Sequence, residues 1–305
     1  MFEVSVYSLQ LLTFIFLNLI LSLSMVITLS SGQLSLSHAG FMSIGAYTSA
    51  ILSKLIPLPL AMISGAGLAA IAGLLAGYPA LRLSGLYLAI ATLGFGEVVR
   101  VTMLNLEITN GALGLSRIPS LGSVLHSYFP LPVAAQKSKA LLSLFSVSSI
   151  FFIIYFILYR FRHSPYGYVL TAISDDEKAA ASTGISVKSY KLASFVAGAF
   201  LAGFGGALYA HLTTSITPED FAYHRAVEIL SFCVIGGVET LIGPILGTIF
   251  LTLLPEWMRF LSDYKMIFYG LLLLSVMAFR PAGLITVPFI NKIKQSFRSL
   301  RNARS

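Results

Sequence analysis

Three consecutive acids, Asp175, Asp176 and Glu177, interrupt a sequence in which charged residues make up only 10% of the 305 positions. Acids in such a row could take part in catalysis, bind a metal, or lie at the start of a helix, where the helix dipole favours negative charge. The sequence offers no His, Cys and acid grouping at metal-ligand spacing, and no nucleophile paired with a base. We therefore expect no catalytic residue and no metal site, and we expect these acids to lie at the start of a helix.

The residues around the acids predict a short capped helix. Ser174 can cap it, with Glu177 reaching back in a Ser-x-x-Glu capping box, and Gly184 can end it. The helix would span about nine residues, with Ala179 and Ala180 in its body. Isolated helices under about 12 residues are marginal in water, so this helix needs a partner surface. It either seats in a groove of another protein or is only a connecting helix.

A second charged pair lies inside an apolar segment, where burying charge is costly. Glu97 and Arg100 are one helical turn apart and could form a structural ion pair, or contribute to a substrate path near the polar stretch 109–114. His38 begins an apolar segment and is expected to cap or pack rather than relay protons. The further candidates for the path are residues at helix starts and breaks, namely Gly40, Tyr47, Asn110, Gly111, Gly236 and Gly237.

Composition shows which elements must position these residues. Hydrophobic residues make up 56% of the chain, the mean hydropathy is +0.86, and the apolar residues come in blocks. The first block, 9–29, matches a hydrocarbon core of about 30 Å and lacks the basic region of a signal peptide. Further blocks cover 40–56, 58–75, 86–104, 141–159, 192–212, 227–238, 241–255 and 266–279. We expect an all-α polytopic transmembrane bundle of about 8 to 10 membrane segments.

Some blocks are too short for an ordinary span. Blocks 227–238 and 241–255 are bounded by Gly236-Gly237 and Gly243-Pro244. They are either broken or re-entrant helices that line a path, or tilted short helices joined by a tight turn.

Two spans carry a small residue at every fourth position, which lets helix backbones approach closely within a bundle or at a subunit interface. Gly65 and Gly73 belong to the first stripe, with Ala69 and Gly77. Gly198 and Gly206 belong to the second, with Ala202 and Ala210.

Lys and Arg in the short loops indicate the orientation. Twelve of the twenty fall on one side if the C-terminus is cytoplasmic. The loop 160–191 is then cytoplasmic and the N-terminus lies outside. Residues 1–290 are expected to form a single membrane domain, followed by a basic tail, 291–305. Ile290, Ile293, Phe297 and Leu300 repeat at helical spacing, as in a helix on an anionic leaflet; a disordered tail is the alternative. Lipid headgroups account for the net charge of +8, so no nucleic acid is expected.

The run SPYGYVLTAISDDEKAAASTGISVKSYKLASFVAGAFLAGFGGALYA resembles the cytoplasmic loop and following span of LivM-like permeases, the branched-chain amino acid type of ABC importer permease. Its E-x-A-A-x-x-x-G pattern is similar to the permease signature that contacts the ATPase, with one residue inserted between the Glu and the Ala pair. Four stretches, beginning at Leu34, Leu81, Val234 and Tyr269, also resemble that family, so the resemblance extends over nearly the whole chain.

The resemblance implies an importer in the plasma (inner) membrane. Two cytoplasmic ABC ATPases would dock on the loop through Asp175, Asp176, Glu177, Ala179, Ala180 and Gly184. A solute-binding protein would dock outside, and a second homologous permease would complete the path. The chain contains no G-x-x-x-x-G-K-[ST] phosphate loop, so it needs no cofactor of its own, and ATP and Mg²⁺ would belong to the partner subunits.

Alternatives remain open for the substrate and for the transport class. An importer of the same class could carry urea or short amides. An ion-coupled secondary transporter would need coupling carboxylates inside its spans, where Glu97 is nearly the only candidate. A channel or a structural assembly protein would tolerate changes of Glu177 or Gly184.

Overall fold

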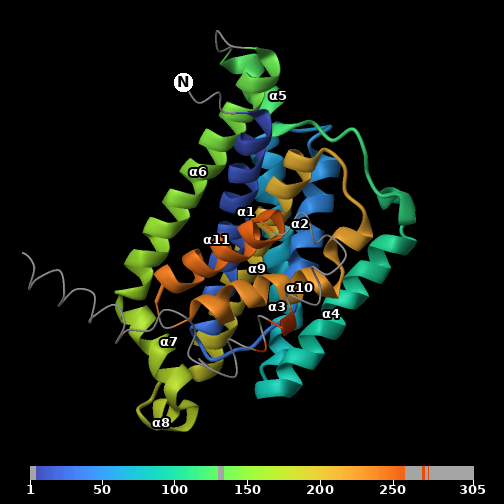
Figure 1. Cartoon of the computed structure of the whole chain (residues 1–305). Coiled ribbons are helices and arrows are strands. Elements are labelled where there is room, and N and C mark those ends of the chain that lie inside the picture. The colour runs from blue at the N-terminus through green and yellow to red at the C-terminus, as the bar shows by residue number, and fades with distance from the viewer. Residues whose placement is uncertain (1–4, 130–133, 239, 258–269, 272–273, 275–305) are drawn as a thin grey trace, which may run out of the picture. The chain divides into compact units, whose positions relative to one another are not determined.

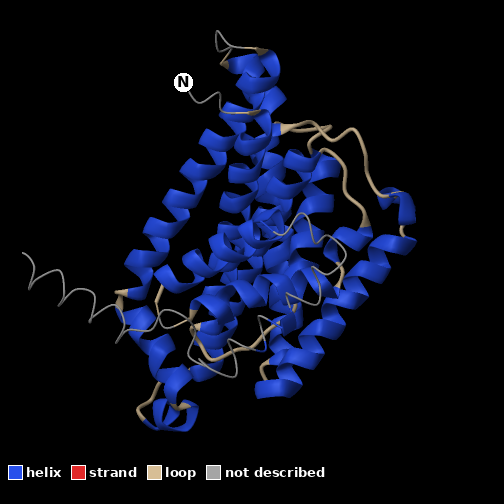
Figure 2. Cartoon of the chain, viewed as in Figure 1, coloured by secondary structure: helices blue, strands red, loops and turns tan. Residues whose placement is uncertain are grey.

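The computed structural model describes residues 5–129, 134–238, 240–257, 270–271 and 274. The regular elements of this part of the chain are all helices (Figure 2), which confirms the predicted all-α fold. The chain divides into two compact units, one up to Ile229 and one from Leu230.

Five helices of the first unit are long and apolar enough to cross a membrane, as expected of a multi-pass membrane protein. They are α1 (Val6–Leu29), α3 (Leu58–Ala80), α4 (Gly85–Asn105), α6 (Ala135–Arg162) and α9 (Val187–Thr213). A sixth apolar helix, α2 (His38–Leu52), is shorter and almost wholly buried. The connections hold α5 (Leu121–Tyr128), α7 (Pro165–Asp175) and α8 (Glu177–Ser182), and the 3-10 turns η1 (Glu107–Thr109), η2 (Gly111–Leu113) and η3 (Pro218–Phe221).

Helices α2 and α9 form the centre of the first unit. Helix α9 packs against α1, α2 and α3, while α4 packs against α2 and η3, and α6 packs against α1. Helix α8 lies at the end of this unit opposite to α5 (Figure 1). The long helices therefore separate α8 from the opposite end of the first unit.

Small residues permit the close approach of the central helices. A Cβ atom built on Gly206 would lie 1.9 Å from the Met42 carbonyl oxygen, and one on Gly73 would lie 2.5 Å from the Cβ atom of Ala199. Gly65 and Gly198 are equally crowded, against Gly45 and Thr28. Lipid tails supply no hydrophobic drive between helices, so such contacts must hold the bundle together. The contacts of both glycine stripes are therefore made within this chain.

The second unit contains α11 (Ile242–Trp257) and the end of α10 (Tyr223–Gly236). Helix α10 has 14 residues and α11 has 16, fewer than the roughly 20 needed to cross a membrane upright. Gly236, Gly243 and Gly247 let the backbones touch, and Gly237 turns the chain with φ of +93°. Most of the predicted segment 266–279, and the tail 291–305, lie outside the described residues.

The sequence did not predict α5 or α7. Each is capped by a serine: the Ser120 Oγ accepts a hydrogen bond from the Ser123 N–H, and the Ser164 Oγ accepts one from the Gly167 N–H. Both helices have 11 residues or fewer and no continuous apolar block, so hydropathy gave no signal for them.

Candidate coupling element and substrate path

The acids at 175–177 begin a helix, but not in the predicted way. Asp175 is the last residue of α7, and the backbone at Asp176 is extended, with φ of −153° and ψ of 106°. The Asp176 Oδ1 accepts hydrogen bonds from the N–H groups of Lys178 at 2.8 Å and Ala179 at 3.0 Å. Asp176 is thus the N-cap of α8, and the predicted Ser174 capping box is wrong. The chain bends at Asp176, so α8 has six residues instead of about nine.

Glu177 is engaged elsewhere, which explains why it does not close a capping box. Its carboxylate forms an ion pair with the ammonium of Lys191, the fifth residue of α9. The buried Ala180 packs in a small apolar cluster with Ile173 of α7 and Val187 of α9. The ion pair and the cluster together attach α8 to the beginning of α9, so a displacement of α8 must act on α9.

The remaining residues of the predicted coupling set are exposed. Asp175, Asp176, Ala179 and Gly184 all lie on the surface. Gly184 has φ of +87° and no atom near the place of a Cβ, so glycine is needed there for the backbone turn and not for packing. The element therefore offers a small, smooth helix with acids at its front, and Ala180 alone of the six faces inward.

Gln33, in the loop between α1 and α2, joins that loop to α9. Its Nε2 donates to the Lys191 carbonyl oxygen at 2.9 Å, the Ser31 Oγ at 2.7 Å and the Ser194 Oγ at 3.1 Å. The side chain is 2% exposed. Sequence reasoning missed Gln33, because its partners on α9 lie about 160 positions away and no local pattern marks it.

We expect Gln33→Leu to lower the stability of the protein. The substitution removes all three hydrogen bonds and leaves the Lys191 carbonyl oxygen without this donor. Such a loss costs about 1–3 kcal/mol, which lowers the midpoint of thermal unfolding. The exposed Gln136→Leu at the start of α6 is the matched control and should unfold like the wild type. Equal midpoints for both variants, measured in detergent, would contradict this role of Gln33.

Glu97 and Arg100 form the ion pair that their spacing suggested. The Arg100 Nε lies 3.0 Å from both Glu97 carboxylate oxygens, and the Nη2 donates to Oε1 at 2.6 Å. The structure adds a third member: the Arg100 Nη1 donates to the Glu219 Oε1 of η3 at 2.8 Å. These three residues, the α4 triad, link α4 to η3. The sequence could not supply Glu219, which lies 119 positions from Arg100.

A second charged group lies between α10 and α1. The Arg225 Nη1 donates to the Glu228 Oε2 at 2.5 Å, and the Nη2 donates to the Asn18 Oδ1 at 3.0 Å. Its guanidinium also lies over the ring of Tyr209, 5.8 Å from the centroid. Arg225 and Glu228 have the same three-residue spacing as Glu97 and Arg100, so the sequence carried a local signal for this pair as well.

The other residues predicted to line a path lie at different places in the fold and contact different elements. Gly40 lies where α2 crosses α4 at Gly96, and the ring of the buried Tyr47 lies tilted against that of Phe221 of η3, with centroids 6.0 Å apart. Asn110 and Gly111 have positive φ and form the tight turn between η1 and η2. Gly236 and Gly237 belong to the turn of the second unit. Of the predicted set, Glu97 is connected to η3 through Arg100, which pairs with both Glu97 and Glu219, and Tyr47 makes a ring contact with Phe221 of η3.

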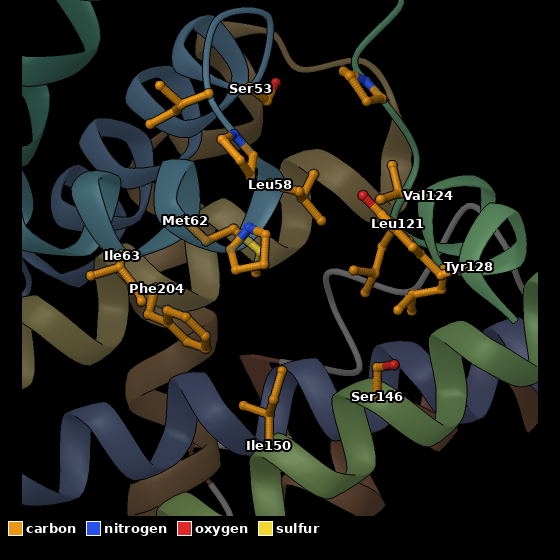
Figure 3. Close-up of a pocket in the computed structure, with 15 residues that line it drawn as sticks. Ser53, Leu58, Met62, Ile63, Leu121, Val124, Tyr128, Ser146, Ile150 and Phe204 are labelled. Atoms are coloured by element: carbon orange, nitrogen blue, oxygen red, sulfur yellow. The ribbon is translucent and has the colours of Figure 1, made fainter.

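An apolar cavity of about 630 Å³ lies between α3, α5, α6 and α9 (Figure 3). Met62, Leu121, Val124, Ile150 and Phe204 are among its lining residues, and none of the described residues that line it is charged. A zwitterion would lose its hydration there without gaining a partner, so this cavity is not the place for a charged substrate.

The part of the chain that the structure describes contains no candidate metal-binding site. No group of three or more His, Cys, Asp or Glu side chains lies close enough there to hold an ion.

Comparison with known proteins adds the family context. Residues 7–277 match the family described as "Branched-chain amino acid transport system / permease component". The chain is 37% identical over 293 residues to the LivM permease protein of a high-affinity branched-chain amino acid transport system from Escherichia coli K12. That alignment covers 90% of this chain and 68% of the relative.

Two other relatives carry corresponding descriptions. The Salmonella typhimurium LT2 protein is 36% identical, with 90% of this chain and 68% of the relative covered. A probable permease of the same type from Methanocaldococcus jannaschii is 23% identical, with 68% and 62% covered. No solved structure matches the chain.

Proposed function

Because this chain belongs to the family of permease components of branched-chain amino acid transport systems, we propose that it is a membrane subunit of an ATP-driven ABC importer for branched-chain amino acids. The observation that carries the proposal is the family match over residues 7–277. A solute-binding protein would deliver the substrate from outside, and the path would lie between this chain and a second homologous permease subunit.

The two cytoplasmic ATPases would dock on α7 and α8. The exposed acids at 175–177 and the exposed Ala179 of α8 support this proposal, as do Tyr166 and Tyr168 on α7, which are 61% and 63% exposed. A helix of six residues is not stable alone, so a partner that covers it would also stabilise it.

ATP-driven closure of the ATPases would displace α8. The ion pair of Glu177 with Lys191 and the cluster around Ala180 would pass this movement to α9. Gln33 would pass it on to the loop between α1 and α2. Movement of the central helices would then close the path to the outside and open it to the cytoplasm, as in other rigid-body switches.

The energy source would lie on other subunits. The 305 residues contain no phosphate loop, so this chain is not expected to hydrolyse ATP, and Mg²⁺ and ATP would be bound by the ATPases. The protein would lie in the plasma (inner) membrane with α7, α8 and the C-terminus in the cytoplasm, in contact with lipids and not with nucleic acid.

Uptake by the complete importer in proteoliposomes tests the proposal. We expect labelled leucine to accumulate only when the binding protein is present outside the vesicles and ATP is present with the ATPases. Labelled urea should not accumulate under the same conditions. Uptake of urea, or leucine uptake that depends on an ion gradient instead of ATP, would contradict the proposed function.

A further inference from the structure

The α4 triad places charged side chains on a membrane helix, on a surface that cannot face lipid. Glu97 and Arg100 are in the central and outer thirds of α4, a candidate membrane span. In this chain the side chains of Glu97 and Glu219 are 46% and 72% exposed, while that of Arg100 is 18% exposed. A charge in the centre of a membrane costs roughly 2.5–3.5 kcal/mol on insertion scales. This face of α4 must therefore meet water or another protein.

The two carboxylates hold Arg100 in different ways. Glu97 accepts from both the Nε and the Nη2 of Arg100, and is fixed one helical turn away on the same helix. Glu219 has one hydrogen bond in the triad, to Nη1, and comes from a short turn. An ion pair with so exposed a partner contributes only about 0–1 kcal/mol. Glu97 therefore keeps the guanidinium of Arg100 in place, while the single hydrogen bond from Nη1 to Glu219 is easily broken.

On the basis of the function proposed above, we infer that the α4 triad is the binding site for the charged end of the amino acid in the path. The α-carboxylate of the substrate replaces Glu219 at the Nη1 of Arg100, and the released Glu219 accepts hydrogen bonds from the α-ammonium. The two charged groups of an α-amino acid share one carbon atom, so they match a guanidinium and a carboxylate that are already adjacent.

The charges of the triad select for a zwitterion. The exchange replaces one charged hydrogen bond of Arg100 with another and adds one to Glu219, so no charge loses its partner. A neutral solute such as urea could not make this exchange without leaving Arg100 and Glu219 partly unpaired. Val98 and Val101 lie beside Glu97 on α4 and are 64% and 42% exposed, which offers an apolar surface to an aliphatic side chain.

The experiment uses the complete importer in proteoliposomes and measures leucine uptake together with ATP hydrolysis. We expect Arg100→Gln and Glu219→Gln each to lower leucine uptake by about tenfold or more, since each removes a charged hydrogen bond to the substrate. ATP hydrolysis stimulated by the loaded binding protein should persist, so fewer leucine molecules enter per ATP. Glu107→Gln, an exposed acid of η1 beyond the end of α4, is the matched control and should transport normally.

A double variant separates substrate binding from a structural ion pair. Arg100→Glu combined with Glu219→Arg keeps the net charge and an ion pair between α4 and η3, but moves the guanidinium to the turn. Uptake should stay low if Arg100 binds substrate. Restored uptake would overturn the inference, as would normal uptake by Glu219→Gln, whose exposed position makes it independent of folding.

Two further outcomes have clear meanings. If Arg100→Gln or Glu219→Gln prevents co-purification of the second permease subunit, the triad is a subunit contact and the inference fails. If the wild-type importer takes up no leucine and its ATP hydrolysis is not stimulated by the binding protein, the proposed function itself fails. Normal wild-type transport with unaffected variants overturns only the role of the triad.

Discussion

Gly206→Leu is expected to abolish the folded protein. The position of a Cβ atom on Gly206 is 1.9 Å from the Met42 carbonyl oxygen, at the crossing of α9 and α2. A backbone oxygen cannot rotate away as a flexible side chain can, so the two central helices would have to separate. Overpacking inside a core costs about 1–3 kcal/mol, and a clash with backbone at this distance costs more. We expect almost no monodisperse protein in size-exclusion chromatography after detergent extraction.

Gly67→Leu in α3 is the matched control for this substitution. It adds the same side chain to another glycine within a membrane helix, but no atom lies within 4 Å of the position of its Cβ. The yield and the elution profile of this variant should match those of the wild type. If Gly206→Leu and Gly67→Leu behave alike, close backbone contact does not hold α2 and α9 together.

Reversing the charges of Asp175, Asp176 and Glu177 together is expected to uncouple ATP hydrolysis from leucine uptake. The substitutions place positive charge at the front of α8, remove its N-cap and break the ion pair with Lys191. The helix would fray and no longer seat on an ATPase, while the membrane helices stay intact. We expect uptake near background, with normal membrane insertion, in proteoliposomes containing the complete importer.

Two smaller changes separate docking from internal attachment. Asp175→Lys alters an exposed charge at the end of α7 and leaves the N-cap in place. Glu177→Lys combined with Lys191→Glu keeps an ion pair between α8 and α9 but changes the charge on the surface. Loss of uptake in both variants supports docking on the acids. ATPase co-purification and uptake at wild-type levels in the triple variant would count against it.

The membrane helices could be predicted from the sequence because their signal is local. A block such as 9–29 is long enough to cross a bilayer whatever surrounds it, and it corresponds to α1. The same holds for the apolar blocks within α3, α4, α6 and α9. The glycine stripes were visible for a similar reason, since a spacing of four residues places them on one helix face.

The partners of the polar residues could be learned only from the tertiary structure. The sequence indicated Ser174 as the cap of the coupling helix, because Ser-x-x-Glu fits the local rule. The structure uses Asp176, since Glu177 is bound to Lys191 and the chain bends between α7 and α8. Glu177 thus takes a partner 14 positions away in place of the local capping box that its sequence neighbours predicted.

The sequence by itself determined that this protein is an all-α membrane bundle with a short acidic helix between two spans, and that Glu97 can pair with Arg100. Only the tertiary structure brought Glu219 to Arg100, Asn18 to Arg225 and Gln33 to the start of α9. The reason is physical: hydropathy and helical spacing act along neighbouring residues, whereas a buried polar group takes whichever partner the packing of distant helices brings within hydrogen-bond distance.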